Sequence, residues 1–557
     1  MGRNRCRFAT VLGCLTAVAL TLPGVASAAD ESPTQLKPIV QRAMKSDVSP
    51  ALRSMTPLPP SAGELREVPI HPLVKPHGPT ATGTEPPSVD PALQTTPPSG
   101  NMPDPIQNFE GVGNRNGVLP PDTDGDVGPN HYVQWVNLSF AVYDKAGNLL
   151  LGPLNGNTLW SGFGGPCETH NDGDIIVKYD RMADRWLMSQ LAFTFSPTFG
   201  PFYQCIAISQ TPDPTGAFYR YAFKISDNKL NDYPKFGVWP DAYYLAVNQF
   251  AQSSYGGQGA VAFDRAAMLA GDPDARMVLF DLLAFDPNLG GMLPSDFDGQ
   301  APRDGSPNTY IEVDFPEGYP TTDDILQVFQ FHVDWVDPTM STFTGPLVLL
   351  TDAFNANLCN FRNCVPQPGG PLLEALSDRL MYRLQYRNFG DHESLVMNHT
   401  VNVGGNRAGI RWYELRKSGQ DDWAIYQQGT YAPEDGINRW MGSIAMDGGG
   451  NIALGFSVSG SATFPSIRYA GRLAGDPPGE LTQGEATLID GNGSQLNASG
   501  RWGDYSLMAV DPTDDCTFWY TQEYYAVTSN AGWQTRVGSF QFPGCGGATA
   551  PTTGNVK

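Results

Sequence analysis

Residues 501–511 read Arg501-Trp-Gly-Asp-Tyr-Ser-Leu-Met-Ala-Val-Asp511, and Thr517-Phe-Trp-Tyr-Thr521 follows after a short connection. The stretch has the pattern of a polar turn, an aromatic-rich strand, a second turn and a second strand. The same layout recurs at Asp232–Asn248 and at Arg439–Asp447, which continues into Asn451–Ser457. One strand unit that recurs along a chain indicates a repeat architecture.

Four weaker copies of this unit begin near Asp126, Gly173, Gly305 and Leu380. Successive copies start roughly 50–75 residues apart, slightly more than the ~40–50 residues of a typical propeller blade, which leaves room for four strands and variable loops. Long segments with helical periodicity are absent from the sequence. We therefore predict an all-β fold, a seven-bladed β-propeller over residues 106–547. Six or eight blades are variants of this prediction, and two β-sandwich domains are its main alternative.

The composition agrees with short strands and tight turns. The 557 residues include 61 Gly and 48 Pro, and only 17% are charged. The formal net charge is −22, so no basic surplus exists to bind a phosphate backbone or an anionic membrane surface. We expect an extracellular glycan or protein as the partner, no nucleic acid, no membrane insertion, and a monomer.

The N-terminus predicts export. Three arginines precede an apolar run, and Ala26-Ser-Ala28 is a small-residue cleavage site of the kind found in secretory signals. We therefore predict a signal peptide over residues 1–29 and a secreted, extracellular or periplasmic protein. A lipoprotein anchor at Cys14 is a minor alternative, because Val11-Leu-Gly-Cys14 resembles a lipobox.

The segment after the signal is unusual in composition. Residues 30–105 hold 17 Pro in 76 positions and no Phe, Trp or Tyr. Such a stretch buries too little apolar surface to offset the loss of chain entropy on folding. We predict a disordered Pro-rich linker or pro-segment here, a folded body that begins near Ile106, and a flexible tail over residues 548–557.

The cysteines support export. Cys6 and Cys14 leave with the signal peptide, and an even number remains: Cys167, Cys205, Cys359, Cys364, Cys516 and Cys545. An even count in an exported protein predicts disulfides, here three, and we favour sequential pairing. Zinc is the competing interpretation, but no Cys-x-x-Cys occurs and the histidines lack ligand spacing.

The motif at Arg501–Ser506, with Phe518-Trp-Tyr520 after it, resembles a repeat of exported bacterial β-propeller proteins that are grouped with exo-sialidase-like proteins. Asp232–Trp239 and Tyr179–Trp186 are similar to other blades of that group, and the resemblance covers most of residues 106–545. It implies a propeller fold and an exo-acting, sialidase-like glycoside hydrolase that acts on extracellular glycans. The Ser-x-Asp-x-Gly-x-Thr-Trp turns of true sialidases do not occur in this sequence.

A sialidase-type reaction needs arginines for the substrate carboxylate, a tyrosine nucleophile with a glutamate base, and an acidic proton donor. The chain offers a candidate for each role: Arg439 and Arg501 with Arg379 or Arg383 for the carboxylate, Tyr505 or Tyr524 as nucleophile, Glu523 as base, and Asp232 or Asp174 as acid, with Asp504 beside them. In the alternative interpretation these side chains pair with one another and join blade to blade. The protein is then a non-catalytic propeller that binds extracellular polysaccharide or protein.

No cofactor is required by these interpretations, but one acidic motif suggests a metal. Pro121-Asp122-Thr-Asp124-Gly-Asp126 places three carboxylates at alternate positions, a pattern compatible with a structural Ca²⁺. The EF-hand pattern fails, because Val127 and Val133 stand where that loop needs Gly and Glu. The alternative is an acidic turn at the start of the first blade.

Overall fold

The computed structural model describes residue 1 and residues 36–60, 65–67, 73, 90–195, 198–252 and 254–545. Apart from Met1, the expected signal peptide and the expected tail at residues 548–557 lie outside the described residues.

Antiparallel runs of strands follow one another along the chain. The first three runs are β6 (Thr123–Val127), β7 (His131–Val136), β8 (Ser139–Asp144) and β9 (Leu149–Asn155); β10 (Ile176–Asp180), β11 (Arg185–Phe193), β12 (Phe202–Ser209) and β13 (Phe218–Ser226); and β14 (Leu230–Val238), β15 (Ala242–Ala251), β16 (Ser254–Asp264) and β17 (Arg276–Asp281). The next two runs share one sheet: β18 (Leu293–Gly299), β19 (Asn308–Asp314), β20 (Ile325–His332) and β21 (Thr342–Leu350); and β22 (Met381–Asn388), β23 (Glu393–Asn402), β24 (Ala408–Lys417) and β25 (Ala424–Tyr431). The last runs are β26 (Asn438–Met446), β27 (Ile452–Gly460), β28 (Thr463–Arg472) and β29 (Glu485–Ile489); and β30 (Leu507–Val510), β31 (Thr517–Tyr524) and β32 (Gln534–Gln541), to which β4 (Gln107–Glu110) adds the outer strand.

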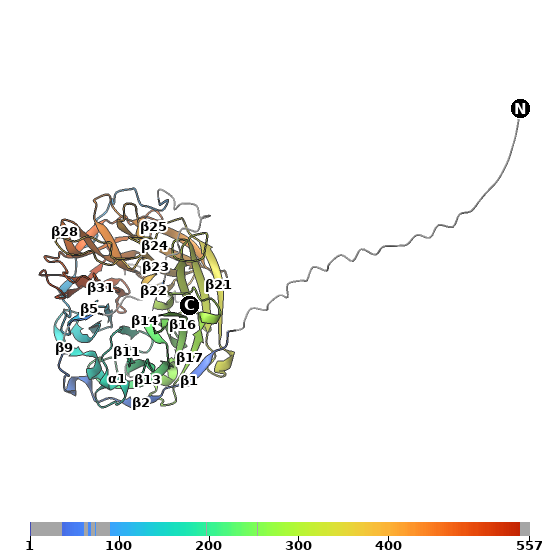
Figure 1. The fold of residues 1–557 in the computed structure, drawn as a ribbon, viewed down its shortest axis with the longest axis vertical. Helices are drawn as coiled ribbons and strands as arrows, with labels where there is room; N and C mark the ends of the chain where they lie inside the picture. The colour runs from blue at the N-terminus through green and yellow to red at the C-terminus, as the bar shows by residue number, and fades with distance from the viewer. Residues whose placement is uncertain are drawn as a thin grey trace, which may run out of the picture. The chain divides into compact units, whose positions relative to one another are not determined.

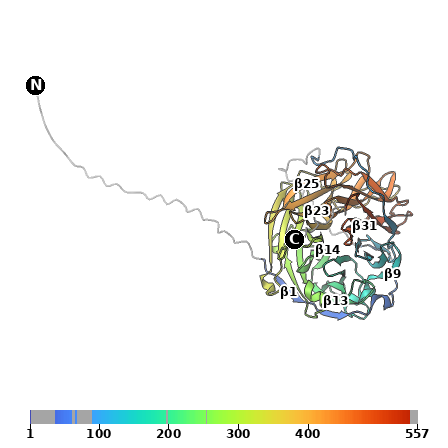
Figure 2. The same cartoon turned by 180° about the vertical axis from the view of Figure 1, so that it is seen from behind.

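The first strands of these runs form a closed ring. Each contacts the first strand of the next run, in the order β6, β10, β14, β18, β22, β26, β30 and back to β6, and the successive sheets follow one another around a centre in Figures 1 and 2. A ring of antiparallel sheets with the first strand innermost is a β-propeller, which confirms the predicted all-β fold. The predicted number of seven blades stays a prediction, because β18 and β22 pair in parallel and join two runs into one sheet.

The inner strands are buried on both faces because neighbouring blades pack against them. Every residue of β26 and β27 is buried, whereas the outer strand β21 has a mostly exposed pattern. Close packing requires small residues at contact points: a Cβ on Gly237 of β14 would lie 2.3 Å from the backbone oxygen of Ser295 on β18. This tight core also explains the aromatic-rich repeat, because large rings fill the space between adjoining sheets.

The prediction that residues 30–105 are a disordered linker is wrong for residues 36–60. β1 (Ile39–Arg42) pairs antiparallel with β17, and β2 (Lys45–Val48) pairs antiparallel with β13. Leu52, in the short 3-10 helix η1 (Leu52–Ser54), is fully buried. Backbone hydrogen bonds to the open outer edges of two sheets hold this segment, and they need neither aromatic rings nor a regular apolar pattern.

The same correction holds for residues 90–105. Leu93 forms a parallel bridge with Thr430 at the edge of β25, and the Thr430 hydroxyl donates a 2.6 Å hydrogen bond to Asp90. Met102 is buried in the core between β28 and β32. Next along the chain, β4 pairs with β32 and closes the ring by joining an N-terminal strand to the last run. The folded body therefore begins well before Ile106.

Removing the anchor of the N-terminal segment should weaken the whole domain. The Asp47 carboxylate accepts hydrogen bonds of 2.7 and 2.6 Å from the guanidinium of Arg220, which is buried. Truncation in Asp47→Ala leaves that buried charge without its partner, so we expect the free energy of unfolding to fall by about 2 kcal/mol. Denaturant unfolding measures this loss. The control is Asp274→Ala, which breaks the exposed Arg42–Asp274 pair and should cost less than about 0.5 kcal/mol; equal losses would contradict the prediction.

The predicted disulfides are confirmed in number and pairing. The bonds are Cys167–Cys205, Cys359–Cys364 and Cys516–Cys545. Cys6 and Cys14 lie outside the described residues. Because all six body cysteines are paired, the competing zinc interpretation has no thiolate left to use.

The remaining elements are short. They are α1 (Pro166–Thr169), α2 (Arg265–Leu269), η2 (Gly156–Trp160), η3 (Leu282–Ala284), η4 (Pro338–Met340), and the parallel pair β3 (Arg66–Glu67) and β5 (Val118–Leu119). Within the described ranges, no helix has the length and apolarity needed to cross a membrane.

Candidate functional site

The backbone departs from ordinary geometry where the chain enters the inner strands. Positive φ angles occur at Asp122 (46°), Asp174 (46°), Tyr233 (53°), Met441 (55°) and Asp504 (67°). Each lies just before an inner strand or within its first residues, so the five share one end of the ring. Non-glycine residues in this region cost free energy, and they concentrate at functional sites.

A lysine that the sequence did not single out lies at the centre of this end. Lys235, on β14, is fully buried. Its Nζ atom lies 3.6 Å from the ring centroids of both Tyr233 and Tyr505 and donates a 3.1 Å hydrogen bond to the carbonyl of Pro234. Burial lowers the pKa of Lys235 to about 8, although the carboxylates of Asp174, Asp504 and Asp122 act in the opposite direction.

The carboxyl groups around this lysine have raised pKa values. Burial, reinforced by the neighbouring Asp232 and Asp504 carboxylates, raises the pKa of Asp174 to about 7. Burial also raises the pKa of Asp122 well above its usual range, with Asp504 and Asp174 adding to the effect. We name Asp122, Asp174, Tyr233, Lys235, Asp504 and Tyr505 the funnel cluster.

Hydrogen bonds between blades hold the funnel cluster together. The Tyr505 hydroxyl donates to the carbonyl of Ile175 at 3.1 Å, and the Asp174 carboxylate accepts from the Tyr233 N–H at 3.1 Å. The Asp122 N–H donates to the carbonyl of Gly503 at 2.9 Å, and within its own blade the Asp122 carboxylate accepts a 2.6 Å hydrogen bond from Asn137. The site is therefore assembled from segments that enter β6, β10, β14 and β30, which lie far apart in the sequence.

Arg501 connects the funnel cluster to further buried acids. Its guanidinium donates to Glu374 at 2.8 Å and also contacts Asp504. Burial raises the pKa of Glu374 to about 7 and that of Glu523 well above its usual range. Three of the eight buried carboxyl oxygens that have no hydrogen-bond partner among the described residues belong to these acids: Asp122 Oδ1, Glu374 Oε2 and Glu523 Oε1.

Two of the predicted arginines border the funnel cluster, because the Arg379 guanidinium lies 5.0 Å from the centroid of the Tyr233 ring and Arg501 contacts Asp504, but all four candidates are held in ion pairs. Arg439 pairs with Asp435, at 2.7 and 3.0 Å, and with Glu485. The other two candidates, Arg379 and Arg383, pair with Asp378 and with Asp296 and Asp298, respectively. These partners differ from the Glu374 and Asp504 partners of Arg501.

The predicted nucleophile Tyr505 and the predicted base Glu523 form hydrogen bonds with different partners. The Tyr505 hydroxyl donates to Ile175, whereas Glu523 accepts a 2.7 Å hydrogen bond from the N–H of Gly503. The alternative nucleophile, Tyr524, donates to Glu110 on β4. Asp232, Asp174, Asp504 and Tyr505 are the predicted residues that do meet, around Lys235. Lys235 was detectable in principle, because it is the one cation of its strand and lies between Tyr233 and Phe236.

The predicted metal ligands serve as links between blades. Asp124 accepts a 2.8 Å hydrogen bond from the N–H of Val177, and Asp126 accepts one of 2.9 Å from Tyr179. The ammonium group of the buried Lys178 lies 3.1 Å from Asp126 and 2.7 Å from Asp296. Among the residues that the structure describes, no three His, Cys, Asp or Glu side chains are placed to hold a metal ion. The calcium expectation therefore finds no set of ligands in this motif.

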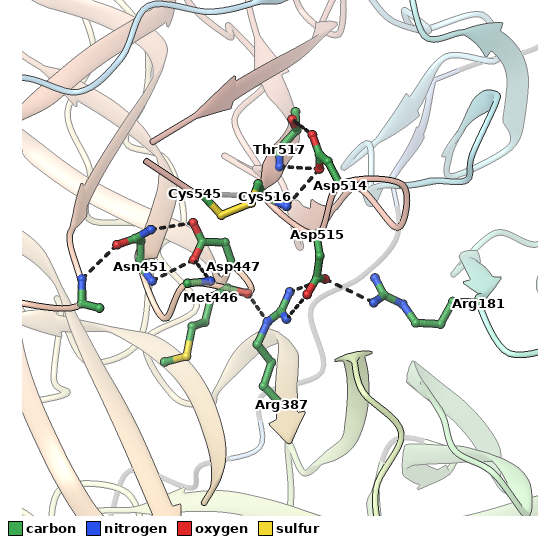
Figure 3. The surroundings of a disulfide bond; sticks show 12 residues. Arg181, Arg387, Met446, Asp447, Asn451, Asp514, Asp515, Cys516, Thr517 and Cys545 are labelled. Carbon is green, nitrogen blue, oxygen red and sulfur yellow. Dashed lines mark hydrogen bonds and ion pairs between the residues drawn. A yellow bond between two sulfur atoms is a disulfide. The ribbon is translucent and has the colours of Figure 1, made fainter. Parts of the chain in front are cut away.

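The opposite ends of the inner strands carry a pocket of about 450 Å³ beside the Cys516–Cys545 disulfide. Figure 3 shows Asp515 between Arg387, at 2.8 and 2.9 Å, and Arg181, at 3.4 Å. Asp514, on the pocket wall, accepts hydrogen bonds from Cys516 and Thr517. Because these carboxylates are already bonded within the protein, we place the chemistry at the funnel cluster, where pKa values are shifted and buried acceptors have no partner.

Comparison with known proteins finds only distant structural likenesses. No family model matches the chain, and no curated protein sequence matches it. Similar solved structures include the WD40 domain of SCAP from fission yeast (10% identity, TM-score 0.32, covering 73% of this chain and 82% of that one). Another is a PL25 ulvan lyase (10% identity, TM-score 0.35, covering 79% of this chain and 94% of that one). A third is a GH43 endo-arabinanase from Bacillus licheniformis (12% identity, TM-score 0.26, covering 57% of this chain and 99% of that one). At such scores these likenesses carry no argument about activity, and the fold assignment depends on the strand pairing.

Proposed function

We propose that this protein is a carbohydrate-active enzyme that cleaves glycosidic bonds in extracellular glycans by acid–base chemistry at the funnel cluster. The observation that carries the proposal is Asp174, a partly exposed carboxyl group whose pKa is raised to about 7 by burial and by the carboxylates of Asp232 and Asp504. A carboxylic acid that keeps its proton near neutral pH is what protonation of a leaving-group oxygen requires.

The other members of the cluster take supporting roles in this proposal. Asp504, whose side chain is 17% exposed and lies against Arg501, acts as the second carboxyl group, which activates water or attacks the sugar. Glycosidases need such a pair, one acid and one carboxylate. Lys235, buried behind both groups, supplies the positive charge that allows several carboxyl groups to share a small volume.

Replacing the acid with its amide should abolish turnover. General acid catalysis contributes about 10²–10⁴-fold to rates, so we expect Asp174→Asn to lose at least about 100-fold in kcat/KM on any glycan that the wild type hydrolyses. A panel of fluorogenic glycosides and polysaccharides, assayed by fluorescence and by release of reducing ends, identifies that substrate. The matched control is Asp241→Asn, because burial raises the pKa of Asp241 to about 6 at a turn outside the cluster. Full activity in Asp174→Asn would refute the assignment.

The sialidase-like form of the proposal further requires arginines that bind the substrate carboxylate. The candidate arginines are engaged with protein carboxylates, so this form needs those ion pairs to open. The second candidate function is a non-catalytic propeller that binds glycan or protein. It is favoured by the many ion pairs that join inner strands, such as Lys178 with Asp126 and Asp296.

We also propose that the protein works outside the cytoplasm, as a secreted or periplasmic monomer. The support is the set of three disulfides, because such bonds persist in oxidising compartments.

A further inference from the structure

Negative charge dominates the funnel cluster and its surroundings. Seven carboxyl groups gather here against three cations: the acids are Asp122, Asp174, Asp232, Glu374, Asp378, Asp504 and Glu523, and the cations are Lys235, Arg379 and Arg501. Each cation is buried and already bonded within the protein. Arg379 donates to Asp378 at 2.8 and 3.1 Å, and Arg501 bonds to Glu374 and Asp504.

A second observation points to a ligand. Asp122 is only 2% exposed, and its Oδ1 atom has no hydrogen-bond partner within the described residues. Glu374, 3% exposed, leaves its Oε2 atom in the same state. Buried acceptors without donors are costly, and a bound donor group would relieve that cost.

The aromatic rings of the site are not available for stacking on a sugar. Tyr233 and Tyr505 are buried, and each presents a ring face to the Lys235 ammonium group at 3.6 Å. Recognition at the funnel cluster therefore depends on hydrogen bonding and charge, which favours a ligand that brings donors and a positive charge.

We infer that the funnel cluster is selective for glycans that contain amino sugars with a free, protonated amine, and that it rejects sialic acids and uronates. The inference rests on the proposed function and specifies its substrate class. The ammonium group of the sugar would donate to the partly exposed carboxylate of Asp504 and be attracted by the neighbouring Asp232, while Asp174 keeps the proton that its role as the acid requires. A substrate carboxylate would meet the same groups and be repelled, because the cations behind them are already paired.

Calorimetry with three defined oligosaccharides tests this inference: a glucosamine hexamer, the N-acetylglucosamine hexamer and a galacturonic acid oligomer. At pH 6 and low salt we expect the amine to bind at least about tenfold more tightly than the acetylated form, and the uronate not to bind. The preference should shrink in 0.5 M NaCl.

Variants locate the effect. Asp504→Asn should weaken binding of the glucosamine hexamer at least about fivefold, and Asp274→Asn, at the exposed Arg42–Asp274 ion pair, should not change it. Melting temperatures of both variants show whether they fold. Equal affinity for the two hexamers, tighter binding of the uronate, or no binding of any probe would overturn the inference.

The same samples separate this inference from the proposed function. Hydrolysis of a neutral or acetylated glycan without preference for the amine overturns the inference and leaves the proposed function intact. Tight binding of the glucosamine hexamer without release of reducing ends supports the inferred ligand class and overturns the proposed catalysis.

Discussion

Arg383→Ala should lower the free energy of unfolding by about 3–5 kcal/mol. Arg383, on the inner strand β22, donates to Asp296 at 2.8 Å and to Asp298 at 2.6 Å, and all three side chains are buried. Truncation leaves two buried carboxylates short of a partner, which is among the most destabilising changes known for polar groups. Denaturant unfolding at constant pH measures the loss.

A control tests whether the loss comes from the buried position of Arg383 on an inner strand or from the loss of any ion pair. Arg42→Ala removes the exposed partner of Asp274 and should cost less than about 0.5 kcal/mol. If both variants lose the same small free energy of unfolding, the buried ion pairs of Arg383 do not hold the inner strands together.

The protein should be markedly more stable at pH 5 than at pH 8. Burial raises the pKa of Asp124, Asp174, Asp314 and Glu374 to about 7 each. Between the unfolded pKa near 4 and this value the native state binds more protons than the unfolded state, so stability falls as pH rises. A single group of this kind contributes a loss of roughly 3 kcal/mol between pH 5 and pH 8.

One histidine opposes this trend in part of the range. Burial lowers the pKa of His399 to about 3, so below pH 6.5 the unfolded state gains a proton that the native state does not take. Four carboxyl groups outweigh this single group, and the net direction remains a loss toward pH 8. Melting temperatures across pH 5–8 measure the slope, and a flat or rising profile would contradict the prediction.

The repeat strands were predictable because their signal is local. The strands β15 and β31 are rich in aromatic residues and polar turns separate the strand units, so the all-β propeller could be inferred from the sequence. The inner strand β18 was missed in the fourth copy, because Leu293-Pro-Ser-Asp-Phe-Asp-Gly299 has no apolar pattern. Its place is set by parallel pairing with β22, which is not visible in local sequence.

The N-terminal segment was mispredicted for a related reason. Composition measures how much core a segment brings, and residues 36–60 bring little. Their position is fixed by partners they meet only in the folded protein, such as the edge of β13 and the guanidinium of Arg220. Disulfide pairing was predictable, because sequential cysteines lie within single blades or loops.

The candidate site could be predicted only in part. Asp174, Asp232, Asp504 and Tyr505 stood out because they occupy repeat starts, which a propeller brings to one end of the ring. Which charges pair could not be inferred, since the partners lie far apart in sequence: Arg501 pairs with Glu374, 127 residues away. Lys235 was overlooked because a single lysine within a strand carries no motif.

The most direct test of the funnel cluster as a functional site is the free energy of unfolding of Asp174→Asn at pH 8. At that pH the wild-type carboxylate is ionised among other carboxylates, so a neutral amide should leave stability unchanged or increase it, while it abolishes turnover. The amide oxygen retains the hydrogen bond from the Tyr233 N–H. A loss of stability greater than about 1 kcal/mol would instead show that Asp174 is a structural link between blades, and it would contradict the account.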